Sequence, residues 1–140
     1  MKNVLVQIFK EVQNLDAMKT KQLEKGLLQL MAEGVAQLFS YELGNKKVVG
    51  VVGALQFEVI QFRLKNEYSA TVQFVPQNIY KACWISSKNP RKLEEFIASK
   101  QRHIARDKDD KLVFMAESKG WLQMVQENFP DIQFHFTSVF

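Results

Sequence analysis

The alternation of apolar and polar residues predicts how the chain begins. Residues 2–12 alternate with the two-residue period of a half-buried strand. A turn with capping residues follows at 14–16, and residues 18–33 have apolar side chains at helical spacing. The apolar side chains on the inner face of this helix are Leu23, Leu27, Leu30 and Met31. Gly26 costs the helix about 1 kcal/mol relative to alanine, which indicates close packing at that point. Gly34 is expected to cap the helix.

A hairpin and a second helix are predicted next. Residues 35–43 alternate again, and Gly44-Asn45 separates them from a second apolar run at 46–52. This dipeptide is typical of a two-residue hairpin turn, so we expect the two runs to pair. The following helix, after Gly53, is expected to have an apolar side formed by Leu55, Val59, Phe62 and the flanking Ile60. A strand over 69–75, closed by a proline, completes this half.

The second half follows the same order of elements without repeating the sequence. Its predicted strands are residues 79–86, 103–106, 111–117 and 132–137. The run 103–106 could equally prolong the helix before it. Asn89 is expected to cap that helix, with Pro90 at its first position. Its inward side chains are Leu93, Phe96 and Ile97. A last helix passes through Trp121, Met124, Val125 and Asn128 and ends before Pro130.

The order strand–helix–strand–strand–helix–strand is that of a ferredoxin-like domain. We therefore predict an α+β protein with a mainly antiparallel sheet and helices on one face. Residues 1–76 form a ferredoxin-like half, and residues 77–140 form a second α/β half packed against it, or both form a single domain. A chain of 140 residues with 46% hydrophobic residues can bury a core without disulfides or metals.

Cysteine and histidine are too few for a disulfide or a metal site. Cys83 is the only cysteine, and the two histidines, His103 and His135, have no metal-ligand spacing. We expect a reducing cytoplasm as the compartment. The apolar runs are far shorter than the ~20 residues that span a bilayer, and no secretory signal pattern is visible at the N-terminus.

Positive charge is concentrated in one part of the chain. The net charge is +4, and residues 81–108 carry +5 while the remainder carries −1. The basic residues of this segment are Lys81, Lys88, Arg91, Lys92, Lys100, Arg102, Arg106 and Lys108. Such a surface favours RNA phosphates through the release of counterions, although a solvated helix face would have the same composition. Because no base-stacking motif is present, we expect any RNA contact to be with phosphates.

The chain contains no pattern that indicates catalysis. Gly50 and Gly53 lie between a strand and a helix but lack the remaining residues of a phosphate-binding loop. They are more typical of a turn and of close packing between helix and strand. Cys83 beside Trp84 in a strand is typical of an inert apolar position. His135 is expected to be exposed and not to act as a base for Cys83. We predict no catalytic residue and no bound cofactor in this chain.

Six segments resemble a known family. The longer segments are Lys19-Thr-Lys-Gln-Leu-Glu-Lys-Gly-Leu-Leu-Gln-Leu30, Glu33-Gly-Val-Ala-Gln-Leu-Phe39 and Val48-Val-Gly-Val-Val-Gly-Ala-Leu-Gln-Phe-Glu-Val-Ile-Gln-Phe-Arg-Leu-Lys-Asn-Glu-Tyr68. The shorter segments are Ala82-Cys-Trp-Ile85, Lys92-Leu-Glu-Glu-Phe96 and Pro130-Asp-Ile-Gln-Phe-His135. Together they are similar to the C-terminal, third domain of bacterial peptide chain release factor 3, over nearly the whole chain from about Phe9. The first half is also similar to the third domain of elongation factor G.

The resemblance implies a ribosome-interacting domain of a translational GTPase that acts in translation termination. Such a protein promotes the dissociation of class I release factors after the peptide has been released. The resemblance also implies that GTP and magnesium bind to an N-terminal domain, which is expected to be missing here together with a β-barrel domain. The implied partners are ribosomal RNA phosphates, a small-subunit protein, the protein's own GTPase domain and, indirectly, class I release factors; no membrane is implied.

Two groups of cations are the predicted ribosome or RNA contacts. Lys19, Lys21 and Lys25 belong to the first helix, and Arg91 and Lys92 belong to the basic segment. Other functions remain open at this point. The chain could be a small-molecule-binding regulatory domain of ferredoxin-like type that pairs sheets edge to edge, or a fragment of another translational GTPase such as elongation factor G. A small phosphatase on this scaffold would need an anion-binding loop that the predicted turns lack.

Overall fold

The computed structural model describes residues 8–138 and consists of two similar halves. The first half contains β1 (Ile8–Asn14), the 3-10 helix η1 (Ala17–Lys19), α1 (Thr20–Ala32), β2 (Gln37–Tyr41), β3 (Lys47–Val51), α2 (Leu55–Tyr68) and β4 (Val72–Pro76). The second half contains β5 (Lys81–Ser86), α3 (Pro90–Ser99), the 3-10 helix η2 (Gln101–His103), β6 (Ile104–Arg106), β7 (Leu112–Ala116), α4 (Lys119–Asn128) and β8 (Gln133–His135). Residues 2–7 of the predicted first strand lie outside the described residues.

The described strands form one antiparallel sheet in the order β4-β1-β3-β2-β6-β7-β5-β8. In each half, the first and third strands are central and the second and fourth are outer, which is the ferredoxin-like order. The halves are joined through β2 and β6, where Ser40 lies opposite Arg106 and Tyr41 lies opposite Ala105. The predicted α+β class with an antiparallel sheet is therefore confirmed.

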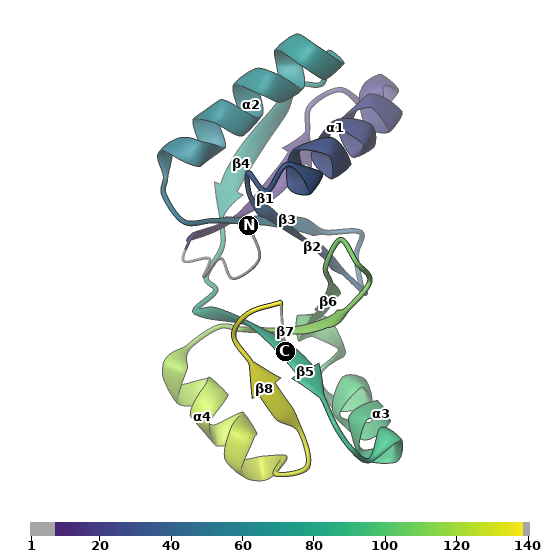
Figure 1. The fold of residues 1–140 in the computed structure, drawn as a ribbon, viewed down its shortest axis with the longest axis vertical. Coiled ribbons are helices and arrows are strands. Elements are labelled where there is room, and N and C mark those ends of the chain that lie inside the picture. The colour runs from purple at the N-terminus through teal and green to yellow at the C-terminus, as the bar shows by residue number, and fades with distance from the viewer. Residues whose placement is uncertain (1–7, 139–140) are drawn as a thin grey trace.

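The two half-sheets are stacked between pairs of helices. Figure 1 shows α1 and α2 at one end of the long axis and α3 and α4 at the other, with the strands between them. One apolar core joins the first pair of helices to its strands, and another joins the second pair to its strands. A third core contains residues from both halves: Phe9, Phe39, Val48, Ala82, Trp84, Ala105, Val113 and Met115. The helix-free faces of the two half-sheets thus pack against each other.

Trp84 is the largest side chain of this shared core and has a polar anchor. Its ring lies 5.7 Å from the Phe39 ring, and its indole Nε1 donates a hydrogen bond to Asp107 Oδ2 at 2.9 Å. The other carboxylate oxygen of Asp107 accepts hydrogen bonds from the backbone amides of Asp109 and Lys111. Asp107 therefore holds the turn between β6 and β7 against the core.

Several local predictions are confirmed because they depend on backbone hydrogen bonds within a few residues. Asn89 Oδ1 accepts from the amides of Arg91 and Lys92 at the start of α3. Gly34 adopts φ 79° after α1, and its amide donates to the Met31 carbonyl. The ambiguous segment 103–106 divides between η2 and β6, so residues 104–106 form a strand and do not prolong α3.

The predicted two-residue hairpin turn and the predicted start of the fourth strand are wrong. The β2–β3 hairpin has a four-residue loop, 42–45, instead of a two-residue turn, because Tyr41 pairs with Lys46 through its amide. Strand β4 begins at Val72 and not at residue 69. Ser69 instead adopts φ 56° and caps α2, with its amide donating to the Lys65 carbonyl.

The predicted apolar side of α2 is also wrong. The buried residues are Phe57, Ile60 and Leu64. In contrast, Leu55, Val59 and Phe62 are 74%, 49% and 68% exposed. Of the predicted set, only Ile60 faces the core. The helix has apolar residues on two faces, so spacing alone did not distinguish the face that packs on the sheet.

Gly26 lets α1 and α2 approach closely, as predicted. A Cβ at this position would lie 2.7 Å from Leu64 Cδ2 and 2.9 Å from the Tyr68 ring. A Cβ at Gly53 would have only Gln56 Oε1 nearby, at 3.9 Å. The close packing expected at Gly53 is therefore not found, and the close approach is between the two helices.

Gly26 and Gly120 provide a matched pair of helical glycines. We expect Gly26→Ala to lower the free energy of unfolding by about 1–2 kcal/mol, because overpacking outweighs the gain in helix propensity. Gly120→Ala, at the second position of α4 with no atom within 4 Å of the new Cβ, should raise it by up to about 1 kcal/mol. Urea unfolding of both variants measures these changes, and equal effects would contradict the packing at Gly26.

Candidate nucleic-acid interface

The predicted contact residues do not form one site. Lys21 and Lys25 are exposed on α1, and Lys19 is half-buried at the end of η1. Arg91 and Lys92 are exposed in the first turn of α3. Because α1 and α3 lie at opposite ends of the molecule, these are two separate basic surfaces (Figure 1). None of the five is paired with a carboxylate of residues 8–138.

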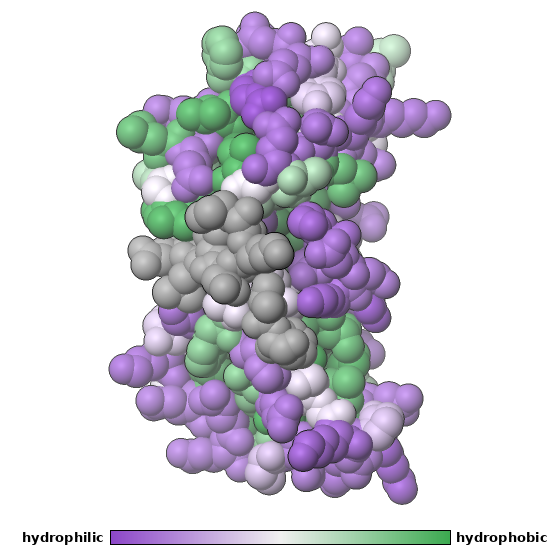
Figure 2. All heavy atoms as spheres, viewed as in Figure 1, coloured by the Kyte–Doolittle hydropathy of each residue, from purple (hydrophilic) through white to green (hydrophobic). Residues whose placement is uncertain are grey.

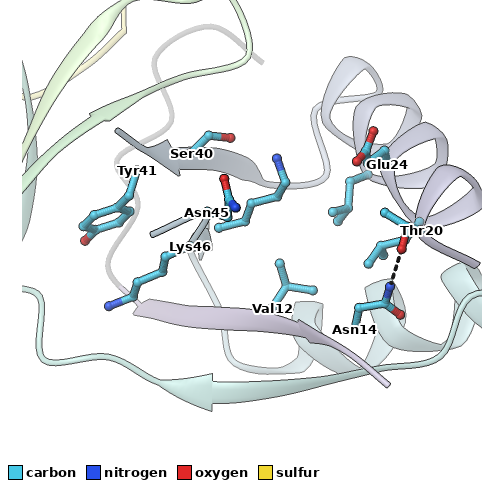
Figure 3. Close-up of a pocket in the computed structure, with 11 residues that line it drawn as sticks. Val12, Asn14, Thr20, Glu24, Ser40, Tyr41, Asn45 and Lys46 are labelled. Carbon is cyan, nitrogen blue, oxygen red and sulfur yellow. Dashed lines mark hydrogen bonds between the residues drawn. The ribbon is translucent and has the colours of Figure 1, made fainter. Parts of the chain in front are cut away.

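A cavity of 530 Å³ lies beside the first of these surfaces. It is bounded by α1, β1 and the β2–β3 hairpin, and Figure 3 shows its lining side chains. Asn14 and Thr20 close one end, where Asn14 Nδ2 donates a hydrogen bond to Thr20 Oγ1 at 3.3 Å. Lys46 and Lys47 approach from the hairpin, opposite Glu24 of α1. The tertiary fold thus brings two hairpin lysines beside the helix that carries the predicted contacts.

The cavity continues into a second hollow of 230 Å³. The two share Glu24, Leu27, Ser40 and Lys47, and the second adds Asp107 and Lys108 from the β6–β7 turn. Together they make a groove beside α1, with Asn14 among the lining residues of the first hollow and Lys108 among those of the second. We call this the α1 groove.

The α1 groove keeps cationic groups that no described carboxylate neutralises. Lys46 Nζ lies 5.0 Å from the centre of the Tyr41 ring, and neither Lys46 nor Lys47 forms an ion pair within residues 8–138. Burial raises the pKa of the Tyr41 hydroxyl well above its usual range, so this group stays neutral. Lys46 and Lys47 were not among the contacts predicted from the sequence, although they directly follow the turn residues Gly44-Asn45.

Part of the basic segment 81–108 is neutralised internally. Arg106 Nε lies 2.7 Å from Glu42 Oε1, and its guanidinium also approaches Asp110 at 3.6 Å. Lys108 pairs with Asp109 at 3.2 Å. The cations of this segment that remain without a described carboxylate partner include Lys88, Arg91, Lys92 and Arg102. Its effective positive charge therefore lies around α3 and η2 and not at the β6–β7 turn.

The glycine-marked turn before α2 is closed by a side chain. Gln56 Oε1 accepts hydrogen bonds from the amides of Val52 and Gly53 at 2.9 and 2.8 Å. Its Nε2 donates to the Val35 carbonyl at 2.6 Å, which ties α2 to the segment that precedes β2. A phosphate-binding loop would have to present such amides to its ligand. Here they are already engaged, which favours the interpretation of this turn as structural.

Cys83 and His135 lie on opposite faces of the sheet. Cys83 is buried in the core beneath α3 and α4, and burial raises the pKa of its thiol to about 12. His135 lies opposite Trp84, whose side chain enters the core on the other face. His135 Nε2 lies 3.1 Å from Ser86 Oγ and is half-buried, so its expected full exposure is wrong. The pair cannot act as nucleophile and base.

In residues 8–138, no three His, Cys, Asp or Glu side chains are grouped so that they could hold a metal ion. Over the same residues, no helix combines the length and apolar character needed to cross a bilayer.

Residues 4–126 match the family model described as class II release factor RF3, C-terminal domain. The chain belongs to this family. The match covers the α1 groove, the hairpin lysines and the basic start of α3, and it ends within α4. The resemblance to the release factor 3 domain is thereby confirmed, and five of the six sequence segments lie within the matched residues. The family supports a role in translation termination.

The thiol of this release factor domain should be inert in the folded state. A free thiol has a pKa near 8.5, whereas Cys83 retains its proton up to about pH 12 in the folded chain. We expect iodoacetamide at about pH 8 to modify the urea-unfolded protein quickly and the native protein at a negligible rate. As pH rises above about 8.5, the unfolded thiol loses its proton first, so Cys83 should destabilise the fold there. Rapid native labelling would contradict the burial of this group.

Proposed function

We propose that this release factor domain docks on the ribosome through the α1 groove, whose lysines contact ribosomal RNA phosphates. Docking through this surface promotes the dissociation of class I release factors from the ribosome. The resemblance to release factor 3 supports the ribosome as the partner and the small subunit, with one of its proteins, as the docking side.

The main support for this docking surface is that several lysines without an ion pair in residues 8–138 surround one groove. Lys46 and Lys47 line it from the hairpin. Lys21 and Lys25 each lie three positions before a lining residue, Glu24 and Leu28, and residues at this spacing are neighbours on a helix surface. Both lysines therefore lie at the rim of the groove. Lysines without carboxylate partners keep their full charge for an external anion. Phosphate contacts of this kind orient a protein on folded RNA without reading its sequence.

Ribosome pelleting at graded salt tests the docking surface. We expect the affinity to fall with salt, and the slope of log affinity against log salt to decrease by about 1 for each phosphate contact removed. Lys21→Glu combined with Lys25→Glu, and Lys46→Glu combined with Lys47→Glu, should each weaken binding and reduce the slope. Lys65→Glu, an exposed position on α2, is the matched control and should change neither. Equal binding by all variants would reject the groove as the docking surface.

The regulatory-domain alternative is less well supported. Pairing of sheets edge to edge would most readily use the outer strand β2, but β2 is already paired with β6 inside the chain. The outer strands of the described sheet are β4 and β8. Strand β8 is only three residues long, and β4 ends at Pro76, so neither offers a long edge for a second molecule.

The apolar stripe of α2 suits the second predicted partner, the protein's own GTPase domain. The stripe consists of Leu55, Val59 and Phe62 of α2 and of Val52 just before the helix, which are between 48% and 74% exposed. In Figure 2, apolar residues interrupt the hydrophilic surface over α2. Contiguous exposed apolar residues of this kind mark contact surfaces. We propose that a GTPase domain on the same protein covers this stripe, which would let the nucleotide state reach the ribosome-docking groove through the closely packed α1–α2 pair.

A cysteine placed in the stripe tests this contact. Val59→Cys should react rapidly with a maleimide in this chain alone, because the position is exposed. Cys83 is buried and should contribute no background. In a longer protein that joins the domain to its GTPase domain, the same cysteine should react at least about tenfold more slowly, because it reacts only while the interface is open and a tenfold ratio needs about 1.4 kcal/mol in favour of the closed form. Gln123→Cys, exposed on α4, is the control and should react equally in both proteins. Equal rates for Val59→Cys would exclude the stripe as the interface.

A further inference from the structure

Another hollow, separate from the α1 groove, lies beside the β2–β3 loop. It has a volume of 490 Å³ and is lined by Leu43 of that loop, by the end of α3 with η2, and by Trp121 in the first turn of α4. Leu43 is 50% exposed. The hollow therefore combines an aromatic side chain, an exposed aliphatic side chain and the basic residues Lys100, Arg102 and His103.

The Trp121 ring is held in place from several sides. It packs on Phe114 at 5.1 Å between ring centres and on His103 at 4.6 Å. Lys100 Nζ lies 5.9 Å from the centre of the ring. The Trp121 backbone amide donates to Ser118 Oγ at 3.1 Å, so the start of the helix is fixed as well. A half-buried tryptophan held in this way is preorganised for a ligand that stacks on it.

The cations of the hollow are available to an anion. Neither Lys100 nor Arg102 forms an ion pair with a carboxylate among the described residues. Glu117 Oε1 lies 3.2 Å from Nε2 of the third basic residue, His103. Lys100 and Arg102, which line the hollow together with Trp121, therefore have no ion-pair partner within residues 8–138, whereas Glu117 lies beside His103.

We propose that this hollow binds one unpaired nucleotide of single-stranded RNA. The base packs against Trp121 and Leu43, and the adjoining phosphates contact Lys100 and Arg102. Aromatic side chains beside cations are the common means of binding unstacked bases, and the volume is in the range of small-ligand sites. An acidic peptide would use the cations but would leave the aromatic and aliphatic side chains without a partner. The choice of RNA over other polyanions rests on the proposed function.

This inference goes beyond contacts with phosphates alone. Phosphates would satisfy Lys100 and Arg102, but they do not account for Trp121 and Leu43 at the same hollow. The site would bind flipped-out or loop nucleotides and would not bind paired bases, whose faces are covered by their neighbours in the helix. It lies between the β2–β3 loop and η2, so the same loop separates it from the α1 groove.

Tryptophan fluorescence gives a direct measurement. The chain has two tryptophans, and Trp84 is 1% exposed and hydrogen-bonded to Asp107, so a ligand-dependent change reports on Trp121. A short oligouridine should quench this fluorescence. It should also bind at least about fivefold more tightly than an abasic oligomer of the same length and charge, as expected from the loss of base stacking. A duplex RNA of matched charge should bind no better than the abasic oligomer.

Variants separate the base contact from the phosphate contact. In anisotropy titrations with labelled oligomers, Trp121→Ala should remove the preference for oligouridine over the abasic oligomer, and Trp121→Phe should retain part of it. Arg102→Glu, at an exposed position, should weaken both oligomers together. Equal affinities of the native protein for the two oligomers, or no quenching by oligouridine at low salt, would overturn the proposal.

The result is distinguishable from a failure of the ribosome-docking proposal. Lys21→Glu combined with Lys25→Glu should weaken ribosome pelleting and leave oligouridine quenching unchanged, because these lysines lie on α1. Loss of quenching in that variant would show that the oligomer binds elsewhere and would also overturn the site.

Discussion

The apolar layer between the two half-sheets is the constraint on which the rest of the structure depends. Phe39 and Trp84 meet there across the halves, and both are almost fully buried. Because the helix-free faces turn toward each other, α1 and α2 are directed to one end of the molecule and α3 and α4 to the other (Figure 1). The same packing places the β2–β3 loop beside η2 and α4, and that loop separates the two proposed binding regions.

The pairing of β2 with β6, which joins the halves, also affects which surface charges form ion pairs. Where β2 meets β6, the Glu42 amide donates to the Ile104 carbonyl and Arg106 pairs with the Glu42 carboxylate. Asp107 is likewise occupied by the Trp84 indole. Glu42, Arg106 and Asp107 therefore help to hold the halves together. The lysines and arginines of α1, the hairpin, α3 and η2 form no ion pair within residues 8–138, so they are open to an external anion.

The close packing of α1 on α2 connects the proposed surfaces. Gly26 leaves no room for a side chain between the helices, so a displacement of α2 would be transmitted to α1 and to the groove beside it. The outer side of α2 carries the apolar stripe, and the outer side of α1 carries Lys21 and Lys25. Interior packing of this density transmits small shifts. The arrangement suits a domain that relays a change from one partner to another.

The sequence alone determined the features that depend on near neighbours. The order of the elements, the caps at Gly34 and Asn89, and the family resemblance could all be read from it, because capping and periodicity involve residues a few positions apart. Only the tertiary structure decided which face of α2 is buried, because both faces are apolar and the choice depends on the sheet beneath. It also decided that Lys46 joins the α1 groove and that Trp121 meets Arg102 at one hollow. Lys46 meets α1 within the first half and Arg102 meets Trp121 within the second, through packing of distant segments of each half. Leu43 reaches the same hollow only because the two halves are joined.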